Sequence, residues 1–189
     1  MPKQKITKEM IVNTAFEIAR TGGMEQVMAK TIAEKLGCSV QPIYSYCENM
    51  DGLRNDIAAQ ARTFIKEYIS AHIDKNDLFR STGQAYLQIA KEEPNIFKIF
   101  IFQERQNISS LEKLYQSETT PQISEKIAAK LNISIEKAKC LHLNMLIYTI
   151  GIGTIFAVTT PGIPVEEMYS CQEYAHQAFL KSALEEKDK

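Results

Sequence analysis

Residues 28–53 read MAKTIAEKLGCSVQPIYSYCENMDGL, and the rest of the chain is organised around them. The first half predicts a short helix whose apolar residues recur at the spacing of one helix face, namely Ala29, Ile32, Ala33 and Leu36. Gly37 can adopt the left-handed backbone conformation that ends such a helix. Beyond the turn, Ser39 is a suitable N-cap for a second helix with Pro42 in its first turn. Two short helices joined by a tight turn that contains glycine predict a helix-turn-helix.

The second helix of this motif carries a candidate DNA-reading surface. We expect Val40 and Ile43 to pack against the first helix. We expect the other side chains, Gln41, Tyr44, Ser45 and Tyr46, at the surface. Of the two tyrosines, Tyr46 should point outward and Tyr44 should be partly buried. A helix-turn-helix presents its second helix to the major groove of DNA. There the amide of Gln41 could pair with adenine, and Val40 and Pro42 could contact a thymine methyl group.

These residues resemble the signature of one protein family. The matching segments are Thr31-Ile32-Ala33, Leu36-Gly37-Cys38-Ser39, Ile43-Tyr44-Ser45-Tyr46 and Leu53. They are similar to the helix-turn-helix of TetR-type transcriptional regulators, over roughly residues 7–53. The chain departs from the family pattern at Met28, where a Ser or Thr cap is usual, and at Cys47, where Phe is usual. It departs again at Met50, where the family usually has a Lys or Arg that meets a phosphate.

The resemblance implies site residues as well as a fold. In the family, the positions of Tyr44 and Tyr46 meet backbone phosphates through their hydroxyl groups. Lys30 and Thr31 lie near the start of the motif's first helix, where side chains can hold the sugar-phosphate track, although Lys30 could equally be a solvated surface lysine. The full candidate set for DNA binding is Lys30, Thr31, Ser39, Val40, Gln41, Pro42, Tyr44, Ser45 and Tyr46.

Composition places the chain among ordinary soluble globular proteins. It has 189 residues, of which 44% are hydrophobic and 24% charged, and its formal net charge is −1. The first sixty residues hold seven cations and seven anions, so no excess of positive charge favours DNA there. This balance argues against strong non-specific DNA binding, which depends on neutralised phosphates, but not against specific binding by a dimer. Four scattered cysteines and no signal peptide predict a cytoplasmic protein with reduced thiols.

The remaining pattern predicts an all-α protein of about nine helices. Residues 1–50 would form the helix-turn-helix DNA-binding domain, and residues 51–189 a helical ligand-binding and dimerisation domain. Expected helices begin after Thr7, at residues 49–51, at Leu78, at Pro94, at Pro121, after Ser134 and near Pro164. The segment 96–102 also has the composition of a strand, but no partner strand is visible, so a helix is expected. Residues 103–120 are expected to be polar and partly mobile.

The most apolar stretch lies near the C-terminus, where residues 143–165 carry no charge. Its length would suit a membrane helix, but threonines and prolines interrupt it and no cationic cluster flanks it closely, which favours a buried helix. Small residues recur every four positions along it. With the last helix, it supplies the candidate dimer interface that the resemblance implies, namely Thr149, Gly153, Ala157, Met168, Ala175 and Phe179. Burial of the same residues in the core of a monomer is the competing interpretation.

Other chemistry is poorly supported by the sequence. The candidate residues for an effector pocket are Tyr86, Phe97, Phe100, Met145 and Tyr148, although the pattern favours plain core for each of them. The three histidines lack partners at metal-binding spacing, and Gly151-Ile152-Gly153 lacks the third glycine of a nucleotide-binding loop. We therefore expect no metal, no cofactor and no enzymatic activity.

Two functional hypotheses follow. The first is a sequence-specific, ligand-responsive repressor that binds a palindromic operator as a homodimer and releases it when a small-molecule effector binds. The second is a dimeric scaffold of the same fold that binds a ligand or a protein and has weakened or lost DNA binding.

Overall fold

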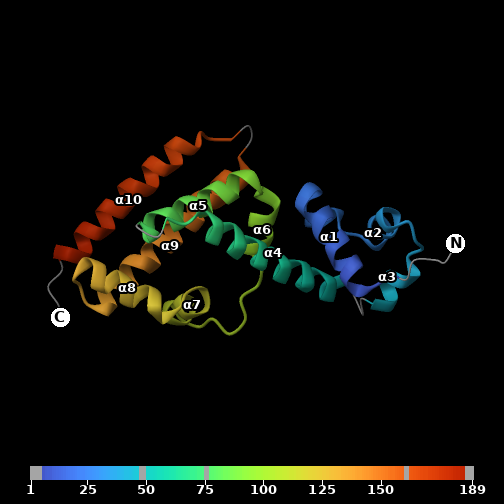
Figure 1. Cartoon of the computed structure of the whole chain (residues 1–189), viewed down its shortest axis with the longest axis horizontal. Helices are drawn as coiled ribbons and strands as arrows, with labels where there is room; N and C mark the ends of the chain where they lie inside the picture. The colour runs from blue at the N-terminus through green and yellow to red at the C-terminus, as the bar shows by residue number, and fades with distance from the viewer. Residues whose placement is uncertain (1–5, 47–49, 75–76, 160–161, 186–189) are drawn as a thin grey trace. The chain divides into compact units, whose positions relative to one another are not determined.

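The structure is a computed structural model that describes residues 6–46, 50–74, 77–159 and 162–185. All regular secondary structure in these ranges is helical (Figure 1), which confirms the all-α fold class. The elements are α1 (Lys8–Gly22), the 3₁₀ turn η1 (Met24–Gln26), α2 (Ala29–Leu36), α3 (Gln41–Tyr46), α4 (Met50–His72), α5 (Leu78–Glu92), α6 (Pro94–Phe102), α7 (Leu111–Glu118), α8 (Pro121–Leu131), α9 (Ile135–Val158) and α10 (Val165–Glu185).

Local capping signals explain most of the helix boundaries. Thr7 accepts a hydrogen bond from the Met10 N–H at 3.2 Å, and Ser134 accepts one from the Lys137 N–H at 3.4 Å. Pro121 occupies the first turn of α8, where its missing N–H costs nothing. These starts agree with the boundaries expected from the sequence.

One helix was not expected. Within the segment predicted to be polar and partly mobile, α7 forms because Ser110 caps it and accepts from the Lys113 N–H at 3.2 Å. Tyr115 anchors it, since this side chain is buried and its hydroxyl group lies 2.9 Å from Nδ1 of His142 on α9. A single buried apolar residue is too weak a pattern to predict a helix from the sequence.

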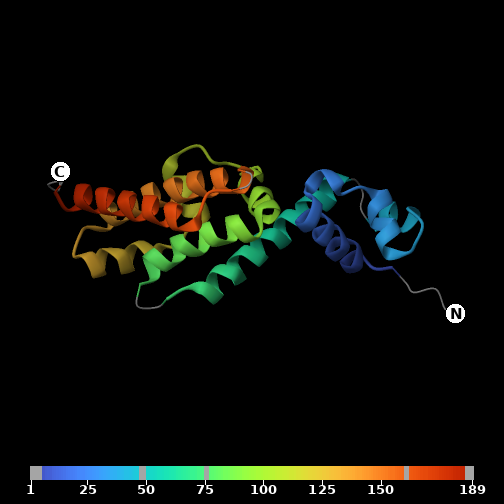
Figure 2. The same cartoon turned by 90° about the horizontal axis from the view of Figure 1, so that it is seen from above.

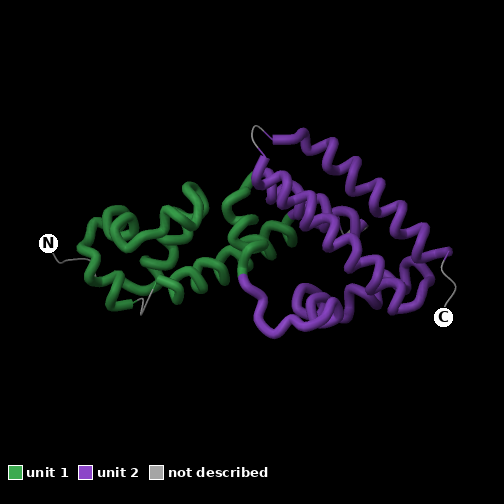
Figure 3. Tube along the Cα trace, turned by 180° about the vertical axis from the view of Figure 1, so that it is seen from behind, with its two compact units in different colours: residues 1–71, 92–103 green, residues 72–91, 104–189 purple. Residues whose placement is uncertain are grey.

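The chain divides into two compact units (Figure 3), each described by itself. Unit 1 comprises Met1–Ala71 and Glu92–Gln103, and unit 2 comprises His72–Lys91 and Glu104–Lys189. Helix α6 therefore packs in unit 1, although the chain on both sides of it belongs to unit 2. From the sequence, a boundary is expected between residues 50 and 51, separating a DNA-binding domain from a ligand-binding and dimerisation domain. This division by function stays a prediction.

Unit 1 is built from α1 to α4 together with α6. The strand-like segment that forms α6 is helical, as expected, and it buries Ile96, Phe97, Ile99 and Phe100. Its N-terminal end is tied to α1 by a bidentate ion pair, in which Arg20 Nε lies 3.1 and 2.9 Å from the two carboxylate oxygens of Glu93. Its C-terminal end is tied to α4, since Arg62 Nη2 donates to Gln103 Oε1 at 3.0 Å. Helix α6 is thus fixed to unit 1 at both ends.

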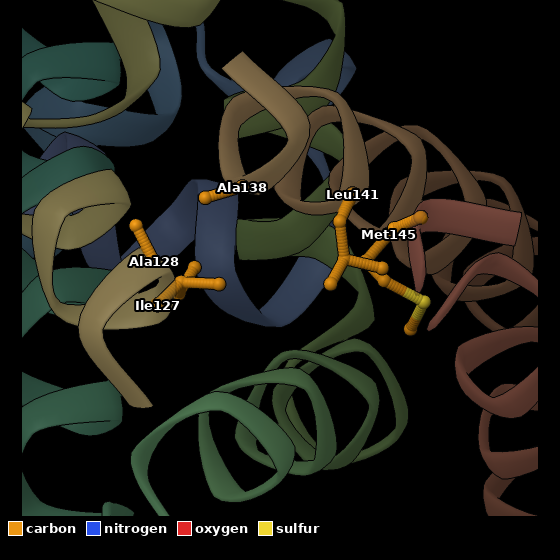
Figure 4. Packing of buried hydrophobic residues seen from close by; sticks show 6 residues of the cluster. Ile127, Ala128, Ala138, Leu141 and Met145 are labelled. Carbon is orange, nitrogen blue, oxygen red and sulfur yellow. The ribbon is translucent and has the colours of Figure 1, made fainter. Parts of the chain in front are cut away.

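Unit 2 is organised around α9, which packs against α8 and α10 (Figure 2). Six buried residues of α8, α9 and α10 form an apolar cluster: Ile127, Ala128, Ala138, Leu141, Met145 and Ala183. Figure 4 labels all of them except Ala183. A buried polar contact joins α9 to α10, where Gln172 Nε2 donates to Thr149 Oγ1 at 3.1 Å.

The residues expected at a dimer interface lie inside the protomer. Thr149, Gly153 and Ala157 are buried, as are Met168 and Ala175 on the neighbouring α10. Phe179 is half-buried, with its ring centroid 6.3 Å from that of Tyr148. Helix α10 of the same chain packs against α9 and contacts Thr149 through Gln172, so the competing interpretation, burial in the protomer, describes where these residues lie. Whether a second copy binds stays a prediction.

Candidate nucleic-acid interface

The start of α2 is held by an unusual cap. Met28 stands at the N-cap position in extended backbone, and its side chain makes no capping hydrogen bond. Thr31 compensates, because its Oγ1 accepts from the Met28 N–H at 3.1 Å and donates to the Gln26 carbonyl at 2.8 Å. The hydroxyl group of Thr31 is therefore already engaged with backbone groups, which leaves its methyl group as its freer contact surface.

The turn between α2 and α3 depends on Gly37. This residue has a φ of 65°, in the left-handed region, and its N–H bonds to the Glu34 carbonyl at 3.2 Å. Helix α3 then begins at Gln41, with its first turn closed on the Val40 carbonyl by the N–H groups of Ile43 and Tyr44. Val40 rather than Ser39 therefore stands at the N-cap position. An N-cap at Ser39 would bond the backbone N–H three residues later, at position 42. Pro42 has no N–H, which disfavours the predicted cap at Ser39.

Helix α3 exposes most of its surface. Ile43 is fully buried and attaches the helix to the unit, whereas Gln41 and Ser45 are exposed as expected. Tyr44 is 62% exposed and Tyr46 41% exposed, so the expectation that Tyr44 is partly buried was wrong. Tyr44 follows Ile43 by one residue, and this step turns it about 100° away from the buried face.

Val40 also lies differently from the expectation. It is 41% exposed rather than packed against α2. Because it precedes the helix, its spacing of three from Ile43 does not place the two side chains on one helix face. The surface formed by the turn and α3 thus offers an aliphatic group, an amide and two phenol rings. We call the residues Val40, Gln41, Pro42, Tyr44, Ser45 and Tyr46 the recognition surface.

The rest of the candidate set lies close by in sequence and is accessible. Ser39 in the turn and Lys30 on α2 are exposed, and Lys30 Nζ lies 3.9 Å from a Glu34 carboxylate oxygen. Ser45 is exposed, but its Oγ donates to the Gln41 carbonyl at 3.0 Å. All nine residues therefore belong to α2, the turn and α3, and their contacts with DNA stay a prediction.

Charge is scarce on and around the recognition surface. No lysine or arginine occurs between Lys35 and Arg54. Two described cations of unit 1 face carboxylates: Arg54 lies 3.0 Å from Asp51, and Lys8 lies 2.9 Å from Asp56. Exposed ion pairs of this kind are weak, so they can exchange a carboxylate for a phosphate at small cost. The electrostatic attraction that this unit offers to DNA is nevertheless modest.

The predicted effector residues are divided between the two units. Phe97 and Phe100 are buried in unit 1, whereas Tyr86, Met145 and Tyr148 belong to unit 2. Unit 2 has an open cavity of about 380 Å³ on α5 and α10, lined by Arg80, Tyr169, Ser170, Glu173, Tyr174 and Gln177. None of the five predicted residues lines it. The cavity was missed because its residues lie on the polar face of α10, which the apolar pattern of the sequence does not mark.

A second exposed surface was also missed. Along α9, Ile147 is 47%, Ile155 51% and Val158 60% exposed, and Gly151 lies between them with nothing within 4 Å of where a Cβ would be. These positions share one helix face, which we call the aliphatic face of α9. By length and composition α9 could span a membrane, and only 39% of its most apolar window is buried within the protomer. From residue 143 onward α9 carries no charged residue, so its sequence does not show which face stays exposed.

Metal chemistry finds no support in the described part of the chain, where no three His, Cys, Asp or Glu side chains gather in a way that could hold an ion.

Comparison with known proteins identifies solved structures that share this arrangement of helices. No protein-family model matches the sequence, and no curated protein matches it significantly. Solved structures do match. One is a TetR-like transcriptional regulator from Rhodococcus sp. RHA1, with a TM-score of 0.65 and 13% identity, covering 94% of this chain and 99% of that one. Another is a TetR variant from Acinetobacter baumannii AYE in complex with minocycline, with a TM-score of 0.63 and 12% identity, covering 94% and 96%. The chain therefore has the fold of TetR-like transcriptional regulators, as the resemblance of the helix-turn-helix implied.

Proposed function

We propose that the chain is a sequence-specific DNA-binding transcriptional regulator. The observation that carries the proposal is the recognition surface: Gln41, Tyr44 and Tyr46 are exposed on the second helix of a helix-turn-helix. A short helix that exposes an amide and two phenols, and buries only Ile43, is suited to enter a major groove. The fold that the chain shares with TetR-like transcriptional regulators supports the same function.

The proposed active form is a homodimer on a palindromic operator. Two copies related by a two-fold axis would place their recognition helices about 34–36 Å apart, in successive major grooves. The aliphatic face of α9 supports self-association, because exposed isoleucines and valine on one helix face are costly to leave in water. The residues proposed to meet the second copy are thus Ile147, Gly151, Ile155 and Val158, in place of the buried set expected from the sequence.

Release from DNA is proposed to follow binding of a small molecule. One protein of this fold is in complex with minocycline, which supports a small-molecule effector in general but not a particular one. An effector that binds the predicted ligand-binding domain would favour a state in which the spacing of the recognition helices does not suit the operator. It can shift the equilibrium between the two states only by the difference between its affinities for them.

Selection from a random duplex pool tests the proposal directly. The full-length protein should recover a palindromic sequence at low salt in the absence of any added ligand. The Tyr44→Ala and Tyr46→Ala variants should each bind the recovered duplex at least about tenfold more weakly, since each loses a contact from the recognition surface. Leu111→Ala, which shortens an exposed side chain on α7, is the matched control and should bind normally. Failure to recover any palindrome would refute the proposal.

A second candidate function is favoured by the charge distribution. The chain has no lysine or arginine between Lys35 and Arg54, and Met50 stands where the TetR family usually has a phosphate-binding Lys or Arg. A dimeric scaffold that binds a ligand or a protein, without DNA, would fit these two features. This alternative gains if the protein dimerises but selects no DNA, or if Tyr46→Ala leaves DNA binding unchanged.

A further inference from the structure

We propose that the recognition surface reads A·T base pairs and makes no direct contact that selects guanine. This inference rests on the proposed function and specifies its substrate, namely an operator whose half-sites are defined by adenine edges and thymine methyl groups. Three features of the surface carry it: the missing cations, the free amide of Gln41 and the exposed aliphatic group of Val40.

The missing cations remove the commonest reader of guanine. Specific contacts to the O6 and N7 acceptors of guanine come mostly from Arg or Lys side chains. The chain has neither residue between Lys35 and Arg54, a range that includes the whole turn and all of α3. Arg54 lies on α4 and pairs with Asp51 at 3.0 Å. Lys35 lies on α2, the first helix of the motif, which in this class crosses the DNA backbone rather than entering the groove.

Gln41 is placed to read adenine. It is the first residue of α3, and the N-terminal residues of a recognition helix are those that contact base edges. Its side chain is exposed, and its amide has no hydrogen-bond partner among the described residues. A glutamine amide matches the N6 donor and N7 acceptor of adenine with two hydrogen bonds. The backbone of α3 at this point is steadied by the Ser45 hydroxyl group, which donates to the Gln41 carbonyl at 3.0 Å.

Val40 and Pro42 flank this amide with apolar groups. Val40 is 41% exposed at the N-cap position, and Pro42 is half-buried in the first turn. Thymine is the one base that presents a methyl group in the major groove. An aliphatic side chain left in water at the tip of a recognition helix gains from covering that methyl group, by about fourfold in affinity for each one. Together with Gln41, these residues favour A·T pairs at neighbouring positions of a half-site.

The experiment combines selection with modified bases, using the full-length protein. Selection from a random duplex pool should recover a palindrome whose half-sites contain invariant A·T pairs. Replacing a contacted thymine by uracil in both half-sites removes only the methyl groups and should weaken binding about 16-fold for two contacts of fourfold each. Replacing the contacted adenine by 7-deazaadenine removes the N7 acceptor and should weaken binding about tenfold or more.

Variants assign these losses to side chains. In Val40→Ser, the loss caused by uracil should largely disappear, and serine at an N-cap position preserves the helix start. In Gln41→Ala, the loss caused by 7-deazaadenine should disappear, whereas Gln122→Ala, at an exposed glutamine of α8, should retain both losses. A selected palindrome defined by G·C pairs, or one insensitive to both modified bases, would overturn this inference while leaving the proposed function standing. Recovery of no palindrome would overturn the proposed function, and this inference with it.

Discussion

Helices α3 and α9 each expose a surface, and the two surfaces differ in kind. The six-residue α3 buries only Ile43 and exposes an amide, a hydroxyl group and two phenols. The 24-residue α9 buries one side firmly and still exposes isoleucine and valine on another. A polar, uncharged surface suits a partner with hydrogen-bonding edges, whereas an aliphatic surface suits a partner that is itself apolar. The chemistry of the exposed face, rather than the amount of buried surface, therefore distinguishes the proposed DNA-binding role of α3 from the proposed dimerisation role of α9.

The largest expected effect tests the partner of α9. Ile155→Glu should weaken self-association at least about 100-fold, because each copy loses an apolar contact worth roughly 1.5–3 kcal/mol and gains a charge to bury. Sedimentation equilibrium over a range of protein concentrations measures the change. Leu111→Glu places the same charge on an exposed leucine of α7 and should leave association intact. A wild-type protein that stays monomeric at high concentration would contradict the proposed role of α9, because a second copy would then not cover the aliphatic face.

Acid sensitivity should arise in unit 2, at the polar contact between Tyr115 and His142 that anchors α7 to α9. Burial lowers the pKa of His142 from 6.5 to about 4. Because this pKa is lower in the folded state, the unfolded state binds more protons between pH 6.5 and 4. Stability is therefore intact above pH 6.5 and falls as the pH drops through this window, by up to about 1.4 kcal/mol per pH unit, on the order of 3 kcal/mol in all.

Urea unfolding between pH 4 and 7 measures this pH dependence. The His142→Asn variant should show a flatter profile than the wild type. Tyr115→Phe removes the hydroxyl group next to His142 but keeps the burial, so its profile should stay steep. Parallel profiles for the wild type and His142→Asn would contradict the assignment.

A smaller loss of stability is expected at the contact between α5 and α10. A Cβ added at Gly83 would lie 2.2 Å from Gln172 Nε2, too close for the buried amide to stay in place. Gly83→Ala should therefore break the hydrogen bond to Thr149, at a cost of about 1–3 kcal/mol of unfolding free energy. The higher helix propensity of alanine offsets roughly 1 kcal/mol of this cost. The Gln172→Ala background removes the obstructing group, so the same glycine substitution should cost less there. Additive effects in this double-mutant cycle would count against the predicted clash.

The smallest effect concerns the salt dependence of DNA binding. No lysine or arginine occurs between Lys35 and Arg54, so binding of a dimer should release few counterions. The slope of log K against log salt should not be steeper than roughly −5, compared with about −10 for a protein that neutralises many phosphates. Titrations by fluorescence anisotropy at several salt concentrations give this slope. A steep slope would show that the ion pairs of Lys8 and Arg54 open to take up phosphates.

Much of the fold could be predicted because its signals are local. The caps at Thr7 and Ser134, the proline that opens α8 and the glycine that ends α2 act within a few residues of themselves. Helix α7 was missed because its stability depends on Tyr115, whose partner His142 is remote in sequence. The exposure of Val40 and Tyr44 was mispredicted for a related reason, since helical periodicity does not apply in a turn and fixes little over six residues.

The sequence by itself determined the helix-turn-helix, most helix boundaries and the uncharged character of the recognition surface, because each depends on residue types at short separations. Only the tertiary structure decided that α6 packs with unit 1, that the small residues of α9 are buried within the protomer, and that Ile147, Ile155 and Val158 remain exposed. An apolar pattern gives the direction of the buried face only when another face is polar. From residue 143 onward α9 has no charged residue to mark an exposed face, so contacts with the neighbouring helices determine which face is buried.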